Sequence, residues 1–201
     1  MLLLTTTALA HSGLLSPPPR YPSDGLDDNK ACPCGVGLSG RLCEVASDRS
    51  DPDRSDDITT FQPGETILMR WREVIGHAGR WRVAFDLDGA DMADFNANIL
   101  LDIEDPDGDA GNVGDGNLWE VQVTLPTTPC DNCTLQLVQM MDGDTSSPVA
   151  DPIGRSSYYQ CSDIVLAGEP LDPPADTETG GGCSTLGASL WTALPGLLGR
   201  R

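Results

Sequence analysis

The chain of 201 residues is predicted to fold as an all-β domain, an antiparallel β-sandwich with long disulfide-stapled loops. Three observations support this prediction. Several segments show the composition and period of strands, clusters of Gly, Pro and Asp separate them, and no long stretch keeps the 3.6-residue apolar period of a helix. Short strands of this kind, divided by turn residues, are typical of a sandwich.

The first ten residues, MLLLTTTALA, form an apolar leader that ends in Ala8-Leu9-Ala10. Signal peptidase accepts small residues in this spacing. We therefore expect residues 1–10 to be a signal peptide, cleaved after Ala10. His11 would then be the mature N-terminus of a single domain over residues 11–167.

The segment that follows His11 is rich in proline and then in polar residues. Residues 14–22 contain too many prolines for a helix or a central strand, so we expect an extended segment that lies across a surface. Residues 23–57 are polar, glycine-rich and contain three cysteines, which indicates a long disulfide-stapled loop.

A β pattern begins at Ile58. The predicted strands are residues 65–73, 80–86, 118–125, 133–141 and 158–167. In the second of these, one face would carry Trp81, Val83 and Phe85, and the other Arg80, Arg82 and Ala84. A period of two with one apolar face predicts a half-buried strand.

The seven cysteines indicate disulfides. They are Cys32, Cys34, Cys43, Cys130, Cys133, Cys161 and Cys183. In an exported chain the first six would form three disulfides, with Cys183 outside the domain and the connectivity open. The pair Cys130 and Cys133 also has the spacing of a zinc knuckle, but no histidine lies near it in the sequence, so disulfides are favoured.

The chain is strongly acidic, with 12 Lys and Arg against 31 Asp and Glu and a formal charge of -19. Such a field repels phosphate backbones and anionic lipids, which excludes nucleic acid as an expected partner. Residues 102–117 contain Asp105, Asp107, Asp109 and Asp115. This loop fails the calcium-binding EF-hand template at Ala110 and Gly116, so a solvated acidic loop is the favoured interpretation.

Beyond residue 167 the composition changes to Pro, Asp, Thr and Gly, and we expect residues 168–182 to be a disordered linker. Residues 183–201 contain Cys183, an apolar run too short to span a bilayer comfortably, and a basic end. This arrangement resembles the C-terminal sorting signals of myxobacteria and their relatives. The resemblance implies cleavage near Cys183 and tethering at the cell surface or outer membrane; the alternative is an ordinary weak membrane anchor.

The chain contains two histidines, His11 and His77. A histidine at a free N-terminus offers two nitrogens to one metal ion, the α-amine and the imidazole. His77 lies in a small-residue turn, Gly76-His77-Ala78-Gly79, before the strand at residues 80–86. Three nitrogens in a tetragonal arrangement suit copper(II), which is therefore the predicted metal.

Further sequence features resemble the lytic polysaccharide monooxygenases and their bacterial relatives. They are His11, the Gly76-His77 turn before an aromatic strand, residues 129–137 (PCDNCTLQL) and the closing run from Tyr158 to Ile164 (YYQCSDI). The closing run is similar to the Phe-Tyr-x-x-x-Asp-Val ending of chitin-active bacterial members. The resemblance covers most of residues 11–167 and implies an immunoglobulin-like or fibronectin-III-like sandwich with copper on a flat, exposed face.

Position by position, the resemblance assigns His11 and His77 to a histidine brace and Tyr158 to the aromatic at the copper axial position. A buried core tyrosine is the alternative for Tyr158. Tyr159 lies on the opposite strand face and should point elsewhere. A Gln or Glu near the copper is usual in the family, and Gln160, Gln139 and Glu44 are unranked possibilities.

The resemblance implies a secreted, monomeric enzyme that uses copper and an external electron donor to cleave glycosidic bonds of chitin, cellulose or another glycan oxidatively. Two alternatives stay open. One is a non-catalytic histidine-brace module that binds or transfers copper at the cell surface. The other is an adhesion domain in which His11 is never exposed as an N-terminus.

Overall fold

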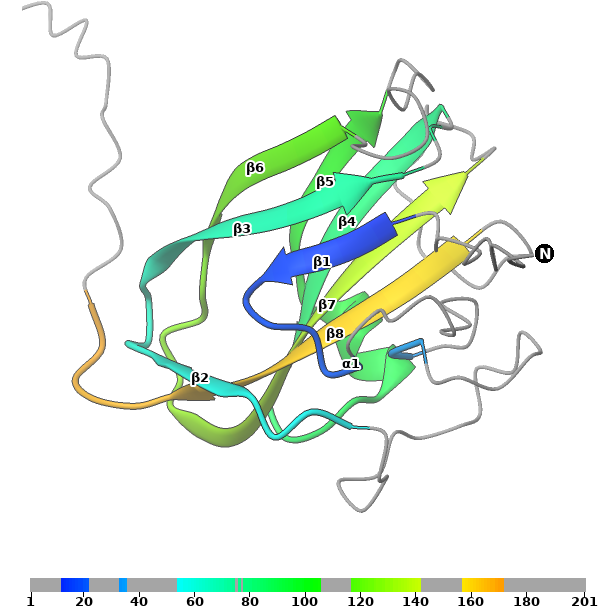
Figure 1. Cartoon of the computed structure of the whole chain (residues 1–201). Coiled ribbons are helices and arrows are strands. Elements are labelled where there is room, and N and C mark those ends of the chain that lie inside the picture. The colour runs from blue at the N-terminus through cyan, green and yellow to red at the C-terminus, as the bar shows by residue number, and fades with distance from the viewer. Residues whose placement is uncertain are drawn as a thin grey trace, which may run out of the picture.

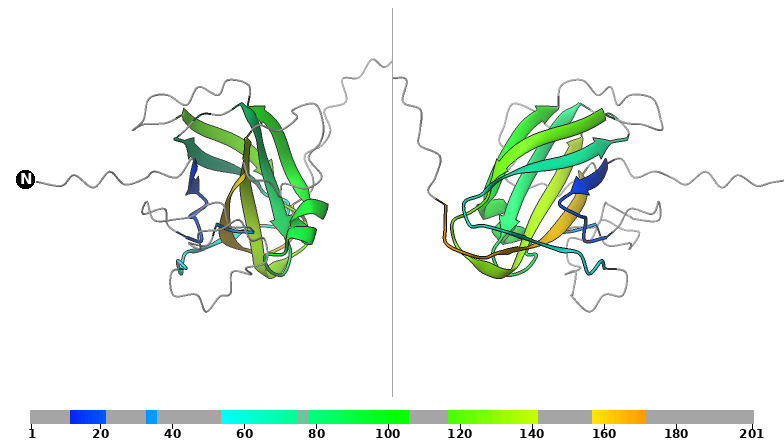
Figure 2. Two further views of the ribbon diagram at one scale, coloured as in Figure 1. Left: turned by 90° about the vertical axis from the view of Figure 1, so that its right-hand side faces the viewer. Right: turned by 60° about the vertical axis from the view of Figure 1, so that its left-hand side comes forward.

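The computed structural model describes residues 12–21, 33–35, 54–74, 76, 78–105, 117–141 and 157–171. These residues form two sheets that face each other (Figure 1 and Figure 2). The smaller sheet has the order β1-β3-β6 and the larger has the order β2-β8-β7-β4-β5. The elements are β1 (Ser12–Ser16), β2 (Ile58–Phe61), β3 (Thr66–Glu73), β4 (Gly79–Asp86), α1 (Met92–Ala97), β5 (Ile99–Asp105), β6 (Asn117–Thr124), β7 (Cys130–Met141) and β8 (Ser157–Leu166).

The predicted all-β sandwich is confirmed, with one correction to its topology. Five of the six strand pairs are antiparallel, whereas β2 runs parallel to β8 with Ile58 opposite Asp163. Parallel neighbours need a long connection, and more than 90 residues separate β2 from β8. Among the described residues, no helix is long and apolar enough to cross a membrane.

The core lies between the sheets and is centred on three tryptophans. Trp71 of β3 stacks on Trp119 of β6 with a centroid distance of 5.9 Å, and Trp81 of β4 lies 5.3 Å from Trp71. Trp71 and Trp81 have no exposed surface. Burial of such large apolar rings is the main force that holds two sheets together.

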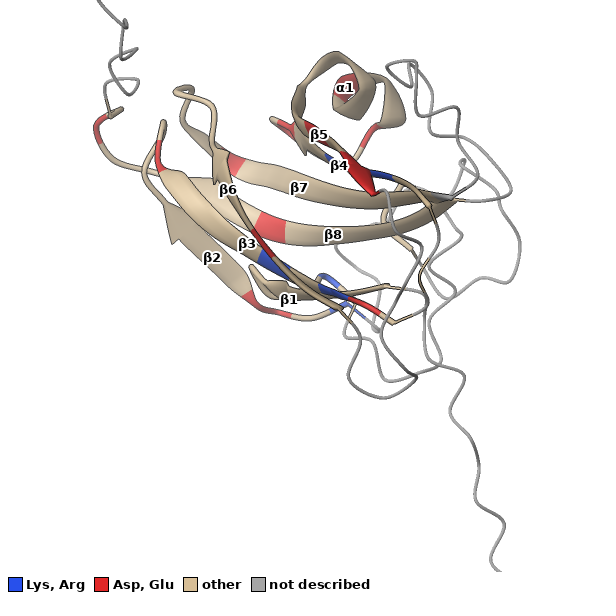
Figure 3. Cartoon of the chain, turned by 90° about the horizontal axis from the view of Figure 1, so that it is seen from above, with Lys and Arg blue, Asp and Glu red and all other residues tan. Residues whose placement is uncertain are grey.

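The prediction that β4 is half-buried is wrong. Trp81 and its apolar partners face the other sheet as expected, but Arg82 and Ala84 on the outer face are also fully buried. Figure 3 shows the reason, since α1 lies against the outer side of the larger sheet. There Phe95 of α1 packs in a cluster with Ala84 and Tyr21.

The predicted loop at residues 102–117 begins with strand residues. Asp102, Ile103 and Glu104 pair with β4, and Arg80 forms an ion pair with Asp102 at 2.5 Å. Asp105 is buried and accepts the Trp81 indole N–H at 3.0 Å. Residues 106–116, which include the other aspartates of this segment, lie outside the described residues.

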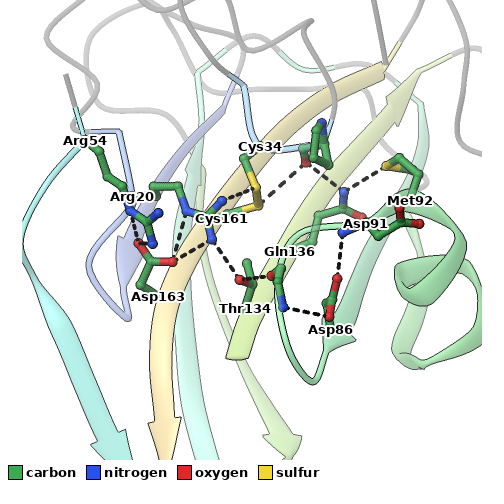
Figure 4. Close-up of a disulfide and its surroundings, with 12 residues drawn as sticks. Arg20, Cys34, Arg54, Asp86, Asp91, Met92, Thr134, Gln136, Cys161 and Asp163 are labelled. Carbon is green, nitrogen blue, oxygen red and sulfur yellow. Dashed lines mark hydrogen bonds and ion pairs between the residues drawn. A yellow bond between two sulfur atoms is a disulfide. The ribbon is translucent and has the colours of Figure 1, made fainter. Parts of the chain in front are cut away.

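The proline-rich segment after residue 11 is extended, as predicted. Its first five residues form β1, an edge strand paired with β3, and the segment then crosses to β8. Arg20 of this segment is 2% exposed. Its guanidinium contacts Asp163 at 2.6 Å and donates to Thr134 Oγ1 at 2.7 Å, and Arg54 binds the second Asp163 oxygen (Figure 4). Burial lowers the pKa of Arg20, which Asp163 partly offsets.

Two of the expected disulfides lie among the described residues. Cys34 bonds to Cys161 and attaches residues 33–35 to the outer face of β8 (Figure 4), and Cys130 bonds to Cys133. The disulfide interpretation is therefore confirmed for these four cysteines, and the zinc-knuckle alternative for Cys130 and Cys133 is wrong. Cys32, Cys43 and Cys183 lie outside the described residues.

The C-terminal boundary of the described domain is marked by a backbone contact. The Leu171 N–H donates to the Pro63 carbonyl at 2.8 Å, so residues 168–171 follow the end of β8 onto the turn before β3. Residues 172–201 lie outside the described residues, as do the expected signal peptide, most of the expected linker and the expected sorting segment.

Candidate metal centre

Seven of the described strands have an end at the same end of the sandwich, on the right in Figure 1. β3, β5 and β7 end there, whereas β1, β4, β6 and β8 begin there. The register fixes this arrangement, since Ser12 and Asn117 both lie opposite Glu73, and Tyr158 and Trp81 both lie opposite Gln139. The inward-facing side chains at this end form a polar layer above the tryptophan core.

Among the described residues, Glu73 is one of two buried carboxylates at this end of the sandwich, the other being Asp105. Glu73 occupies an inward position of β3 and is 1% exposed. Gln139 Nε2 donates to one Glu73 oxygen at 3.2 Å, and Trp119 Nε1 donates to the other at 3.4 Å. A buried carboxylate needs such donors because burial without them is costly. Glu73 therefore belongs to a built polar site that joins β3, β6 and β7.

Tyr158 lies beside this pair, and Tyr159 does not. Tyr158 is opposite Gln139 and shares its inward face, whereas Tyr159 is opposite Val138 on the outer face and packs in a cluster with Val138 and Met140. Tyr158 is 5% exposed. The opposite orientation of the two tyrosines agrees with the alternation of side chains along a strand.

Gln139 has an unusual hydrogen-bonding state. Its side chain is 1% exposed, and among the described residues no donor lies within hydrogen-bond distance of Oε1. An orphaned buried acceptor is uncommon in folded proteins. Together with the Glu73 carboxylate, it gives this end of the sandwich an excess of acceptors, which fits a nearby cation or N–H donor.

Comparison with known proteins supports the fold. The chain matches no protein-family model and no curated protein. Among solved structures, it is similar to a lytic polysaccharide monooxygenase AA15 from Thermobia domestica in the Cu(I) state, with a TM-score of 0.53 and 21% identity over 78% of this chain and 99% of that chain. An AA10 lytic polysaccharide monooxygenase from Streptomyces lividans matches with a TM-score of 0.47 and 15% identity, over 79% and 83% of the two chains. The first similarity establishes a shared β-sandwich fold.

The two predicted histidine ligands, His11 and His77, both lie outside the described residues. Their sequence neighbours are described. Ser12 is buried at the start of β1, Gly76 lies between β3 and β4, and Gly79 begins β4. These neighbours belong to the same end of the sandwich as Glu73 and Tyr158.

Sequence reasoning missed Glu73, although a signal was present. Ile67, Met69 and Trp71 define the inward phase of β3, and the next inward position is Glu73. A carboxylate at a strand position where the pattern predicts a buried apolar side chain indicates a polar site. Of the three side chains left unranked, Gln139 and Gln160 belong to this end of the sandwich, whereas Glu44 lies outside the described residues.

A second acidic group lies at the opposite end, beside α1, and consists of Asp86, Asp88 and Asp94. Asp86 is buried and accepts the backbone N–H groups of Asp88, Gly89 and Asp91, which shapes the turn before α1. The nearby Asp86 charge, and less so the other aspartates, raises the pKa of the exposed Asp94. This group therefore has a local structural role.

Proposed function

We propose that the protein is a secreted copper-dependent enzyme that cleaves polysaccharide glycosidic bonds by oxidation. The α-amine and imidazole of His11 and the imidazole of His77 would hold the copper, with Tyr158 beside it. The observation that carries this proposal is the convergence, at one end of the sandwich, of the described neighbours of both histidines and the buried Glu73, Gln139 and Tyr158.

Chain connectivity limits where the two histidines can lie. Consecutive Cα atoms are about 3.8 Å apart, so His11 is tethered to the buried Ser12 and His77 to Gly76 and Ala78. Ser12 pairs with Glu73, which lies three residues before Gly76. The proposed ligands therefore come from two segments, distant in sequence, that the pairing of β1 with β3 brings together.

Glu73, Gln139 and Tyr158 suit a bound, partly desolvated cation. The Glu73 carboxylate would supply negative charge near the cation, and the N–H donors of Gln139 and Trp119 orient this carboxylate. Such outer partners orient metal ligands and tune the metal. The Gln139 Oε1 atom could accept a hydrogen bond from a ligand, and the buried Tyr158 ring would shield the inner side of the site from water. Copper, when bound, supplies one-electron redox chemistry that an external electron donor begins.

The substrate would be chitin, cellulose or another glycan, and the site would act at the cell surface. The enzyme class is supported by the shared fold with a lytic polysaccharide monooxygenase, at 21% identity. Export is supported by the leader at residues 1–10, and tethering by residues 183–201. We propose that the protein acts as a monomer.

The test is product analysis with copper-loaded protein that begins at His11. We expect oxidised oligosaccharides when ascorbate, peroxide and one member of a glycan panel are present, as measured by mass spectrometry. Protein treated with a chelator, and copper without protein, are the controls. If copper binds tightly but no glycan yields oxidised products, the protein is a non-catalytic copper-binding or copper-transfer module instead.

A further inference from the structure

The side-chain amide of Gln160 connects the two sheets at the start of β1. The Leu14 N–H donates to Gln160 Oε1 at 2.6 Å, and Gln160 Nε2 donates to the Ser12 carbonyl at 3.1 Å. Gln160 is 4% exposed, so both bonds are shielded from water. One amide thus satisfies a donor and an acceptor of the same strand.

These two backbone groups lie on the open edge of β1. Residues two apart in a strand present their backbone groups to the same edge, and β1 pairs with β3 on its other edge. The Gln160 amide therefore takes the place of one residue of a neighbouring strand, since it binds the carbonyl and the N–H on either side of Gly13. A buried backbone donor or acceptor needs a partner, and Gln160 supplies one for each of these two groups.

The two hydrogen bonds of the Gln160 amide also fix the register of β1. Ser12 and Leu14 point inward, so a slip of one residue would turn them outward and displace the chain by about 3.4 Å. The next contacts along the segment repeat the pattern, because Ser162 Oγ donates to the Pro17 carbonyl and the Arg20 N–H donates to the Cys161 carbonyl. Gln160 is the member of this series closest to His11.

We propose that Gln160 is the positioning residue of the N-terminus. Its amide sets where the chain leaves Ser12, and hence where the α-amine and imidazole of His11 stand relative to His77. This inference rests on the proposed function in so far as it concerns copper. It gives Gln160 a role distinct from contact with the metal, because its Oε1 and Nε2 atoms both form hydrogen bonds with the backbone of β1.

The test compares Gln160→Leu with Ser162→Ala in protein that begins at His11. Both variants remove buried bonds from β8 to the N-terminal segment, but only Gln160→Leu frees the edge of β1. We expect copper(II) affinity to fall about 10- to 100-fold in Gln160→Leu. The copper(II) electron paramagnetic resonance spectrum should change in that variant and not in Ser162→Ala.

A readout without metal separates this inference from the proposed function. In copper-free Gln160→Leu, amide hydrogen exchange at Leu14 should accelerate about tenfold or more, and it should be unchanged in Ser162→Ala. If the parent chain binds no copper, the proposed function fails and exchange at Leu14 alone decides whether Gln160 holds β1. Unchanged exchange overturns the inference. In a parent chain that binds copper, unchanged copper affinity, or an equal loss in both variants, overturns it as well.

Discussion

Replacement of His77 by alanine is expected to abolish tight copper binding in protein that begins at His11. The proposed site has three nitrogens, and His77 supplies the one that does not come from the N-terminal residue. Loss of an outer partner alone weakens a metal site about 10- to 100-fold, so loss of a direct ligand should weaken it by more than about 100-fold. Isothermal titration with copper(II) under a competing chelator measures this loss.

A shifted histidine is the matched control for this variant. Ala78 is the neighbouring residue and is exposed, so the double variant His77→Ala with Ala78→His restores an imidazole one position away. It should not restore affinity if the geometry of the site matters. The free energy of unfolding, measured on copper-free protein in the presence of a chelator, should change by no more than about 0.5 kcal/mol in either variant. Parental copper affinity in His77→Ala would refute the histidine brace.

Replacement of Asp163 by asparagine is expected to lower the free energy of unfolding by about 3 to 5 kcal/mol. Arg20 and Arg54 both bind Asp163, with side chains 2% and 8% exposed. Removal of the carboxylate charge leaves two poorly solvated guanidinium groups without their shared partner. Urea unfolding with intact disulfides measures the loss.

An exposed ion pair provides the comparison. Arg70 and Glu120 lie 2.9 Å apart on the solvent face of the smaller sheet, and both are nearly half exposed. Glu120→Gln should cost no more than about 1 kcal/mol, because water and ions screen such a pair. If Asp163→Asn lowers the free energy of unfolding no more than Glu120→Gln does, the ion pairs of Asp163 with Arg20 and Arg54 have no special role in stability.

The strands with a clear period of two were predictable from the sequence. β3, β4, β6, β7 and β8 were all expected, with ends that agree within three residues. Most of their inward side chains are apolar and close in sequence to one another, so the pattern is local. The opposite faces of Tyr158 and Tyr159 follow from the same local rule.

Features that depend on partners distant in sequence were not predictable. The burial of Arg82 depends on α1, and the burial of Arg20 depends on Asp163, 143 residues away. The strand character of β1 was hidden by the prolines that follow it, and the edge contacts from Gln160 compensate for its short length. Glu73 acquires its role only when β6 and β7 bring Trp119 and Gln139 to it.

The most direct test of the proposed metal centre is copper binding by two forms of the chain that differ by one residue at the N-terminus. One form begins at His11, and the other carries a single alanine before it. The extra residue leaves both imidazoles in place but removes the α-amine of His11 as a ligand. The proposed site predicts tight copper(II) binding by the first form and a loss of more than about 100-fold in the second. Equal affinity of the two forms would contradict it.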